Sequence, residues 1–154
     1  MEKNKSWIKK LVKTGKEVIV LCRKVGVEPV LYGSFLYVAY TKDASLQIND
    51  LDFYVPEKSF KKIILELVRK KIEHIYTPKW HTLSIVLNKV KVELDSMDYW
   101  YKGKVDTAPF NFNGIRINAL TKEALTAIYK RASEVSDQPE KNRKKYEALM
   151  KTNR

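Results

Sequence analysis

The sequence predicts an α/β (α+β) fold in which helices flank a small mixed β-sheet. Stretches near both ends place apolar residues at helical spacing, and shorter central stretches alternate apolar with polar residues as strands do. The chain has 154 residues, of which 44% are hydrophobic and 31% are charged. This size and composition exclude a disordered or low-complexity chain, and we expect a single domain over residues 1–154.

Helices are expected towards the two ends of the chain. Apolar residues follow helical spacing over 5–25, and Gly26 is a suitable stop. Further along, Thr121 is a suitable N-cap for a helix that ends before Pro139. A last helix, rich in lysine and arginine, is expected over 139–150.

Strands and short helices are expected to alternate in the central part. Residues 30–32 form an apolar run that predicts a buried strand, and this run ends in the turn Gly33-Ser34. Residues 48–55 alternate, which predicts a strand with one apolar and one acidic face. The other expected elements are a short buried helix at 35–40, a helix opened by Pro56 and Glu57, a hairpin of strands 82–87 and 90–95, and a strand at 115–117.

The net charge is strongly positive, and it is unevenly distributed along the chain. Thirty lysines and arginines against eighteen acidic residues give +12 at pH 7, which favours anionic partners such as nucleotides, nucleic acid or an anionic membrane. Residues 32–56 nevertheless hold three acids, Asp43, Asp50 and Asp52, against one lysine. This net-negative segment indicates an acidic site within a basic chain.

The composition also excludes several classes of site. A single cysteine, Cys22, cannot form an internal disulfide, and two separated histidines are too few for a histidine-based metal motif. No apolar run approaches the roughly 20 residues that a membrane-spanning helix needs. The first ten residues lack the apolar segment of a signal peptide. We therefore expect a cytoplasmic protein without a membrane partner.

Four carboxylates are predicted to share one face of the sheet. Asp50 and Asp52 are two residues apart in a strand, so both point to the same face with Cα atoms about 6–7 Å apart. Glu93 and Asp95 repeat this spacing in a later strand. If the strands are neighbours, three or four like charges meet and need cations. Two Mg²⁺ ions with oxygen ligands are the usual solution.

The turn Gly33-Ser34 has the features of a phosphate site. Glycine at the end of a strand lets backbone amides approach a phosphate closely, and a helix that begins at Ser34 directs its positive end there. The Ser34 hydroxyl can add one hydrogen bond.

The ordered combination of turn, acidic strand and later acidic strand resembles the nucleotidyltransferase superfamily of the DNA-polymerase-β type, as a small minimal-type member. The resemblance covers about residues 28–131 and implies a small mixed sheet flanked by helices. It also implies site residues: Gly33 and Ser34 for the triphosphate, Asp50 and Asp52 for Mg²⁺, and Glu93 as third acid with Asp95 as the competing choice.

The leading hypothesis is a Mg²⁺-dependent enzyme that moves a nucleoside monophosphate from a nucleoside triphosphate (NTP) to an acceptor hydroxyl. The acceptor stays open between a small molecule, an RNA and a protein. The alternatives are a non-catalytic module that binds nucleic acid, and a protein-interaction role such as a toxin–antitoxin component. Because the chain leaves little room for a separate acceptor-binding domain, a homodimer or protein partner is a further expectation.

Three other features each have a functional and a structural interpretation. The aromatic residues of 98–101 either stack a nucleobase or cap the core. His81, next to Trp80, is either a base or stacking residue or the half-buried start of a strand. The basic run between Lys141 and Lys145 suits a phosphate backbone, but it is also typical of a solvated helix face.

Overall fold

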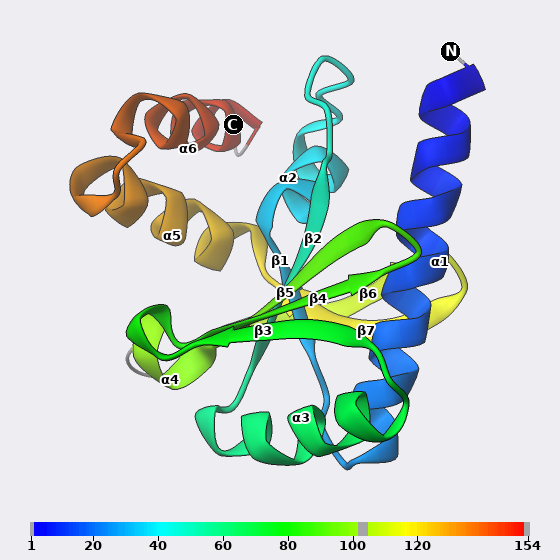
Figure 1. Cartoon of the computed structure of the whole chain (residues 1–154). Helices are drawn as coiled ribbons and strands as arrows, with labels where there is room; N and C mark the ends of the chain where they lie inside the picture. The colour runs from blue at the N-terminus through cyan, green and yellow to red at the C-terminus, as the bar shows by residue number, and fades with distance from the viewer. Residues whose placement is uncertain (1, 102–104, 153–154) are drawn as a thin grey trace.

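The computed structural model describes residues 2–101 and 105–152 and places seven strands in one mixed sheet flanked by helices (Figure 1), which confirms the expected α/β class. The strands are β1 (Val30–Tyr32), β2 (Asp50–Val55), β3 (Glu73–Thr77), β4 (Thr82–Leu87), β5 (Val90–Ser96), β6 (Thr107–Phe112) and β7 (Ile115–Leu120). The helices are α1 (Glu2–Lys24), α2 (Gly33–Thr41), α3 (Phe60–Arg69), α4 (Met97–Trp100), α5 (Lys122–Val135) and α6 (Pro139–Thr152), with 3₁₀ turns η1 (Glu57–Ser59) and η2 (Pro78–Trp80).

The strand order across the sheet is β3-β4-β5-β2-β1-β7-β6. Strand β2 pairs with β5 in parallel, so that Asp52 lies beside Glu93 and Tyr54 beside Asp95. Strand β1 pairs in parallel with β7, and the other neighbouring strands are antiparallel. The two acidic strands are therefore neighbours, as the sequence required for their carboxylates to meet.

One face of the sheet is apolar and packs against α1. Leu51, Phe53 and Leu94 on this face are fully buried. A Cβ atom at Gly15 of α1 would lie 2.7 Å from the Phe112 ring and 2.8 Å from Leu51. Glycine at this position therefore lets the helix backbone approach the sheet closely. Because side chains alternate along a strand, the acidic residues of β2 and β5 point to the opposite face.

Several boundaries differ from the sequence predictions. The two edge strands, β3 and β6, were not predicted: Ile75 in β3 is 67% exposed, and β6 contains Pro109. Edge strands often carry such irregular patterns because one side lacks a partner strand. Strand β7 continues beyond the predicted 115–117 to Leu120.

The predicted helices are present, some of them with shifted starts. Helix α2 begins at Gly33 rather than at residue 35, and the helix expected from Glu57 opens with the 3₁₀ turn η1 before α3 begins. Thr121 caps α5 as expected, because its side chain accepts a hydrogen bond from the Ala124 amide. Among the residues that the structure describes, no helix combines the length and the apolarity that crossing a membrane requires.

Candidate active site

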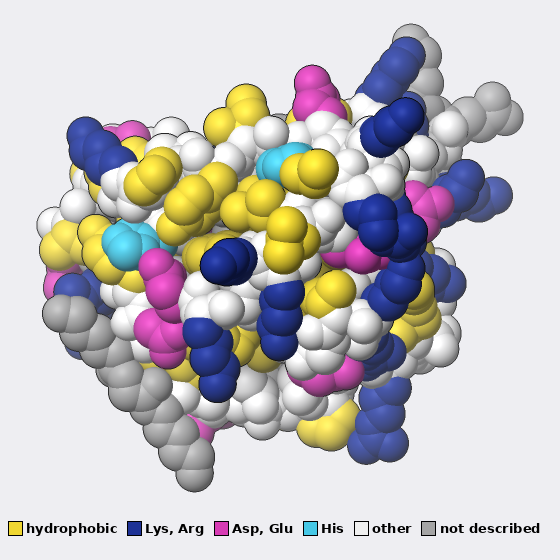
Figure 2. All heavy atoms as spheres, turned by 60° about the horizontal axis from the view of Figure 1, so that its bottom comes forward, with side chains coloured by type: hydrophobic (Ala, Val, Ile, Leu, Met, Phe, Trp, Pro, Cys, Tyr) yellow, Lys and Arg dark blue, Asp and Glu magenta, His cyan; other side chains and the backbone are white. Residues whose placement is uncertain are grey.

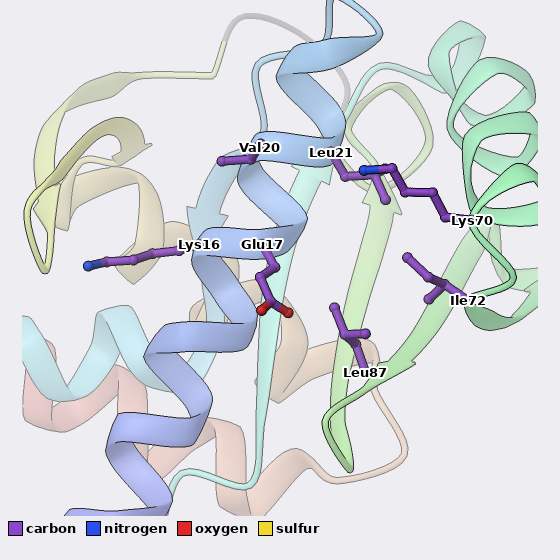
Figure 3. Close-up of a pocket in the computed structure, with 7 residues that line it drawn as sticks. All are labelled: Lys16, Glu17, Val20, Leu21, Lys70, Ile72 and Leu87. Atoms are coloured by element: carbon purple, nitrogen blue, oxygen red, sulfur yellow. The ribbon is translucent and has the colours of Figure 1, made fainter.

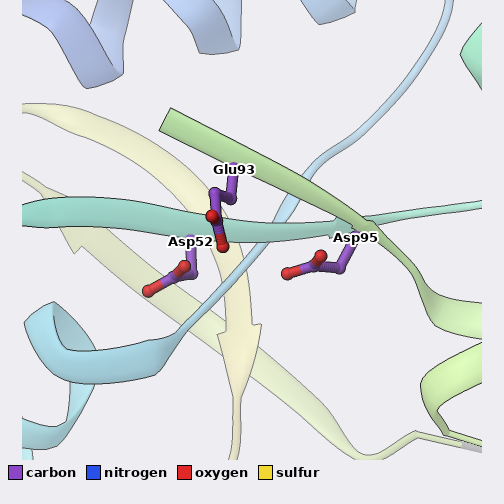
Figure 4. Close-up of side chains that lie close together, drawn as sticks. All are labelled: Asp52, Glu93 and Asp95. Carbon is purple, nitrogen blue, oxygen red and sulfur yellow. The ribbon is translucent and has the colours of Figure 1, made fainter. Parts of the chain in front are cut away.

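A cluster of three carboxylates lies on the face of the sheet opposite to α1. Asp52 of β2 and Glu93 and Asp95 of β5 each place one carboxylate oxygen within 4.8 Å of the others (Figure 4). The parallel register of β2 and β5 produces this arrangement. Asp50 lies two residues before Asp52 in the same strand and is not one of the three. The cluster therefore joins three of the four carboxylates that the sequence singled out.

The cluster concentrates negative charge in a partly buried place. Burial is the main cause that raises the pKa of Asp52 well above its usual range, and the charges of Asp50, Glu93 and Asp95 raise it further. Burial also raises the pKa of Asp50, and Glu93 adds to that rise. A divalent cation with oxygen ligands would relieve this repulsion, so the site has the chemistry of a metal centre.

Glu93 and Asp95 differ in how firmly the protein holds them. Asp95 is buried, its Oδ2 accepts a hydrogen bond from the Tyr32 hydroxyl, and its Oδ1 lies 2.5 Å from Oγ1 of Thr82. Burial raises the pKa of Asp95 to about 6, against the opposing effect of these two hydrogen bonds. The Glu93 side chain stays partly exposed, with its Oε1 2.7 Å from Nζ of Lys91. Glu93 is thus the more accessible of the two carboxylates.

The start of α2 lies directly against Asp52. Gly33 has a φ of +80°, and a Cβ atom there would lie 2.2 Å from Oδ2 of Asp52, so only glycine fits. Tyr32 is the N-cap residue of α2, and its side chain makes no capping hydrogen bond. The first amides of a helix carry partial positive charge and bind anions, so this helix start suits a phosphate.

A buried lysine completes the site from the far end of the chain. Nζ of Lys145 in α6 donates a hydrogen bond to Oγ of Ser34 at 3.0 Å, and it lies 5.1 Å from the Tyr129 ring centroid and 5.7 Å from that of Tyr37. Lys145 is only 8% exposed, and burial lowers its pKa. The buried Leu149 lies one turn further on, so helical spacing was the signal that could have separated Lys145 from the exposed lysines.

Two grooves of the protein surface lie away from the cluster. One, of about 370 Å³, lies between α1 and the β3–β4 side of the sheet (Figure 3); its lining residues are Lys16, Glu17, Val20, Leu21, Lys70, Ile72 and Leu87. Another, of about 440 Å³, borders α3 and includes Phe60 and Tyr76. Exposed apolar side chains, among them Leu65 and Val68, gather on the α3 face with basic residues around them (Figure 2). Neither groove includes a carboxylate of the cluster.

No protein-family model and no curated protein sequence matches the chain. The antibiotic-resistance factor ANT(2″)-Ia matches its fold with a TM-score of 0.67 and 11% identity, over 93% of this chain and 84% of that one. The lincomycin-bound lincosamide antibiotic adenylyltransferase LnuA matches with a TM-score of 0.55 and 14% identity, over 99% and 98% of the two chains.

An antigenic nucleotidyltransferase-like protein from Paracoccidioides brasiliensis also matches, with a TM-score of 0.61 and 12% identity, over 92% of this chain and 76% of that one. These likenesses show that the chain has a nucleotidyltransferase-like fold, as the order of its motifs predicted.

Proposed function

We propose that this chain, which has the fold of nucleotidyltransferases, transfers a nucleoside monophosphate from an NTP to a hydroxyl group of an acceptor with the help of Mg²⁺. The observation that carries this proposal is the contact between the carboxylate cluster and the uncapped start of α2 at Gly33. Carboxylates are ligands for hard divalent cations, and helix amides bind phosphate oxygens. Both kinds of ligand needed for a metal-bound triphosphate are therefore within one site.

The donor set fits Mg²⁺ because it consists of oxygen ligands whose mutual repulsion a cation relieves. Asp52 and Glu93 of this cluster would hold two ions together with Asp50, which lies two residues before Asp52 in β2 and whose pKa Glu93 raises. When bound, Mg²⁺ offsets the charge of the carboxylates and of the reacting phosphate.

The phosphate groups are assigned to the turn and to α6. Backbone amides at Gly33 and Ser34 and the Ser34 hydroxyl would bind the β- and γ-phosphates. Lys145 would supply the positive charge, because its Nζ already lies 3.0 Å from the Ser34 hydroxyl. A cation held in a buried place interacts more strongly with an anion than one in open solvent does.

Glu93 is assigned a second task, as the base for the acceptor. Its partly exposed carboxylate takes the proton of the acceptor hydroxyl, the hydroxyl oxygen bonds to the α-phosphorus, and pyrophosphate leaves. Asp95 acts as a positioning residue, since Tyr32 and Thr82 both contact its carboxylate.

The Asp52→Asn variant tests the proposal. With an α-³²P-labelled NTP, Mg²⁺ and a panel of acceptors, we expect the wild-type chain to transfer label and Asp52→Asn to lose that activity while its circular dichroism stays native. Asp43→Asn is the matched control, because Asp43 is an acid of the same segment whose carboxylate bonds to Ser45 and is not one of the three in the cluster. Equal turnover in Asp52→Asn and wild type would contradict the mechanism. Nucleic-acid binding that Asp50→Ala leaves unchanged, without any transfer, would instead identify a non-catalytic module.

A further inference from the structure

Four rings beside the carboxylate cluster form an aromatic platform, made of Trp80, His81, Tyr99 and Trp100. The rings of Trp80 and Trp100 are nearly parallel at 18°, with centroids 6.2 Å apart, and His81 stacks on Tyr99 at 4.0 Å. Tyr99 and Trp100 meet edge to face at 5.1 Å. Trp80, Tyr99 and Trp100 nevertheless remain 49%, 43% and 42% exposed. These residues therefore do not simply cap the core.

Hydrogen bonds hold the platform in place. Nε1 of Trp100 donates to the Trp80 carbonyl at 2.9 Å, and Nδ1 of His81 lies 2.5 Å from Oε1 of Glu57. The Glu57 amide in turn donates to Asp98 at 2.8 Å. Because the exposed rings are already ordered, a flat ligand that stacks on them costs little additional conformational entropy.

A single threonine connects the platform to the carboxylate cluster. Oγ1 of Thr82 lies 3.1 Å from the Trp80 carbonyl and 2.5 Å from Oδ1 of Asp95. Thr82 also stands opposite Asp95 in the β4–β5 ladder. The backbone that carries the platform is therefore one side chain away from the carboxylate of Asp95, on the side of the proposed acceptor site.

We infer that the platform binds a nucleobase of the acceptor, an inference that rests on the proposed function. Any nucleobase can stack on an aromatic side chain, so stacking does not require a particular nucleotide sequence. Nζ of Lys79 lies 5.1 Å from the Trp80 ring centroid and can pair with a phosphate next to the base. The same lysine disfavours a cationic ligand at that ring. A free nucleoside and the 3′ end of a single-stranded RNA present the same chemistry.

Binding is measured without NTP and without Mg²⁺, so that the result does not depend on transfer. The probe is a 5′-fluorescein-labelled oligo(A) octamer with a free 3′ hydroxyl, followed by anisotropy. We expect Trp80→Ala and Trp100→Ala to weaken its binding about 5- to 150-fold, the range for loss of one stacked base. Leu65→Ala is the control, because Leu65 is 63% exposed on the α3 face, and it should bind as the wild-type chain does.

The dependence of binding on salt separates stacking from general attraction to a basic chain. The two tryptophan variants should keep the wild-type salt slope, whereas Lys79→Ala should reduce it by about one counterion. Wild-type affinity in both tryptophan variants, with native circular dichroism, would overturn the inference, as would displacement of the octamer by ribose as readily as by adenosine.

Competition identifies the source of the base. If adenosine displaces the octamer at a concentration near that of the octamer, the natural ligand of the platform is a free nucleoside. If a large excess of adenosine is needed, the natural ligand is the end of a nucleic-acid strand. Octamer binding is measured without NTP and Mg²⁺, so its result is independent of label transfer. If the transfer proposal fails, the binding result therefore still stands. If only the tryptophan variants lose octamer binding, the loss is due to the platform.

Discussion

Gly33 and Asp52 are in contact at a position that excludes any side chain on Gly33: a Cβ atom there would lie 2.2 Å from the Asp52 carboxylate. The turn proposed to bind phosphate and the strand proposed to bind metal are thus one structural unit. The left-handed backbone of Gly33, with φ at +80°, is the conformation that turns the chain from β1 into α2 beside that carboxylate.

We expect Gly33→Ala to destabilise the fold and to displace Asp52. The left-handed backbone alone costs an L-residue about 1–2 kcal/mol, and the clash with Asp52 adds to this cost. Gly26→Ala is the matched control, because Gly26 has nearly the same φ, +79°, and the nearest atom to its Cβ would be 4.0 Å away. Urea unfolding and Mg²⁺ titration calorimetry test both variants. Equal destabilisation of the two, with equal Mg²⁺ binding, would contradict the contact.

Glu93→Gln and Asp95→Asn should separate the two acids of β5. Loss of a base and metal ligand should lower the turnover of Glu93→Gln about a hundredfold or more. Asp95→Asn keeps an oxygen and an amide for Tyr32 and Thr82, so its turnover should fall less than that of Glu93→Gln. Steady-state label transfer measures both. A larger loss in Asp95→Asn, in a folded protein, would make Asp95 the third ligand.

Lys145→Met should weaken NTP binding while it retains much of the packing of the lysine stem. A hydrogen bond to a charged group contributes about 1.5–3 kcal/mol, which corresponds to a loss of affinity of roughly 10- to 150-fold. Lys144→Met removes an exposed charge from the same helix and should change the affinity little. Titration with a fluorescent NTP analogue compares the two, and a similar small effect in both would refute the role of Lys145.

The stability of the metal-free protein should fall as the pH rises from about 4 to 6. The pKa of Asp95 is about 6 in the folded chain against 3.8 ordinarily, so over this interval the folded state binds more protons than the unfolded state. For Asp95 alone the difference between the two pKa values lowers the free energy of unfolding by up to about 3 kcal/mol over this interval. The raised pKa values of Asp50 and Asp52 act in the same direction.

Thermal unfolding with a chelator should therefore give a higher Tm at pH 5 than at pH 7.5, and Mg²⁺ should reduce the difference. Asp95→Asn should also reduce it. A Tm that increases from pH 5 to pH 7.5 in the metal-free protein would contradict the raised pKa values.

The sequence predicted the parts of the site that follow from local spacing. Asp50 and Asp52 in one strand, and Glu93 and Asp95 in another, share a face because side chains alternate, and the parallel pairing of the two strands then brings Asp52, Glu93 and Asp95 together. The turn at Gly33 could be predicted equally well, because few residues other than glycine adopt the backbone conformation of a tight turn before a helix.

The contact of Lys145 with Ser34 could not be predicted in the same way, because it spans 111 residues, although helical spacing to Leu149 marks Lys145 as the lysine on the buried side of α6. Spacing alone does not show where α6 docks, so the partner of this lysine depends on the tertiary fold. The aromatic platform was ambiguous for a similar reason: Trp80 and Trp100 belong to different elements, and their exposure depends on tertiary packing.

The contact between Lys145 and Ser34 also means that two separable parts of the fold form the proposed nucleotide site. The sheet bears the carboxylates, whereas α6, which packs on α2 and α5, brings the lysine. A local opening that releases α5 and α6 would leave the sheet folded and its negative charge intact, yet it would remove this cation from the phosphate side. Binding of a nucleotide would then oppose that opening, so that the ligand itself slows amide hydrogen exchange in α6.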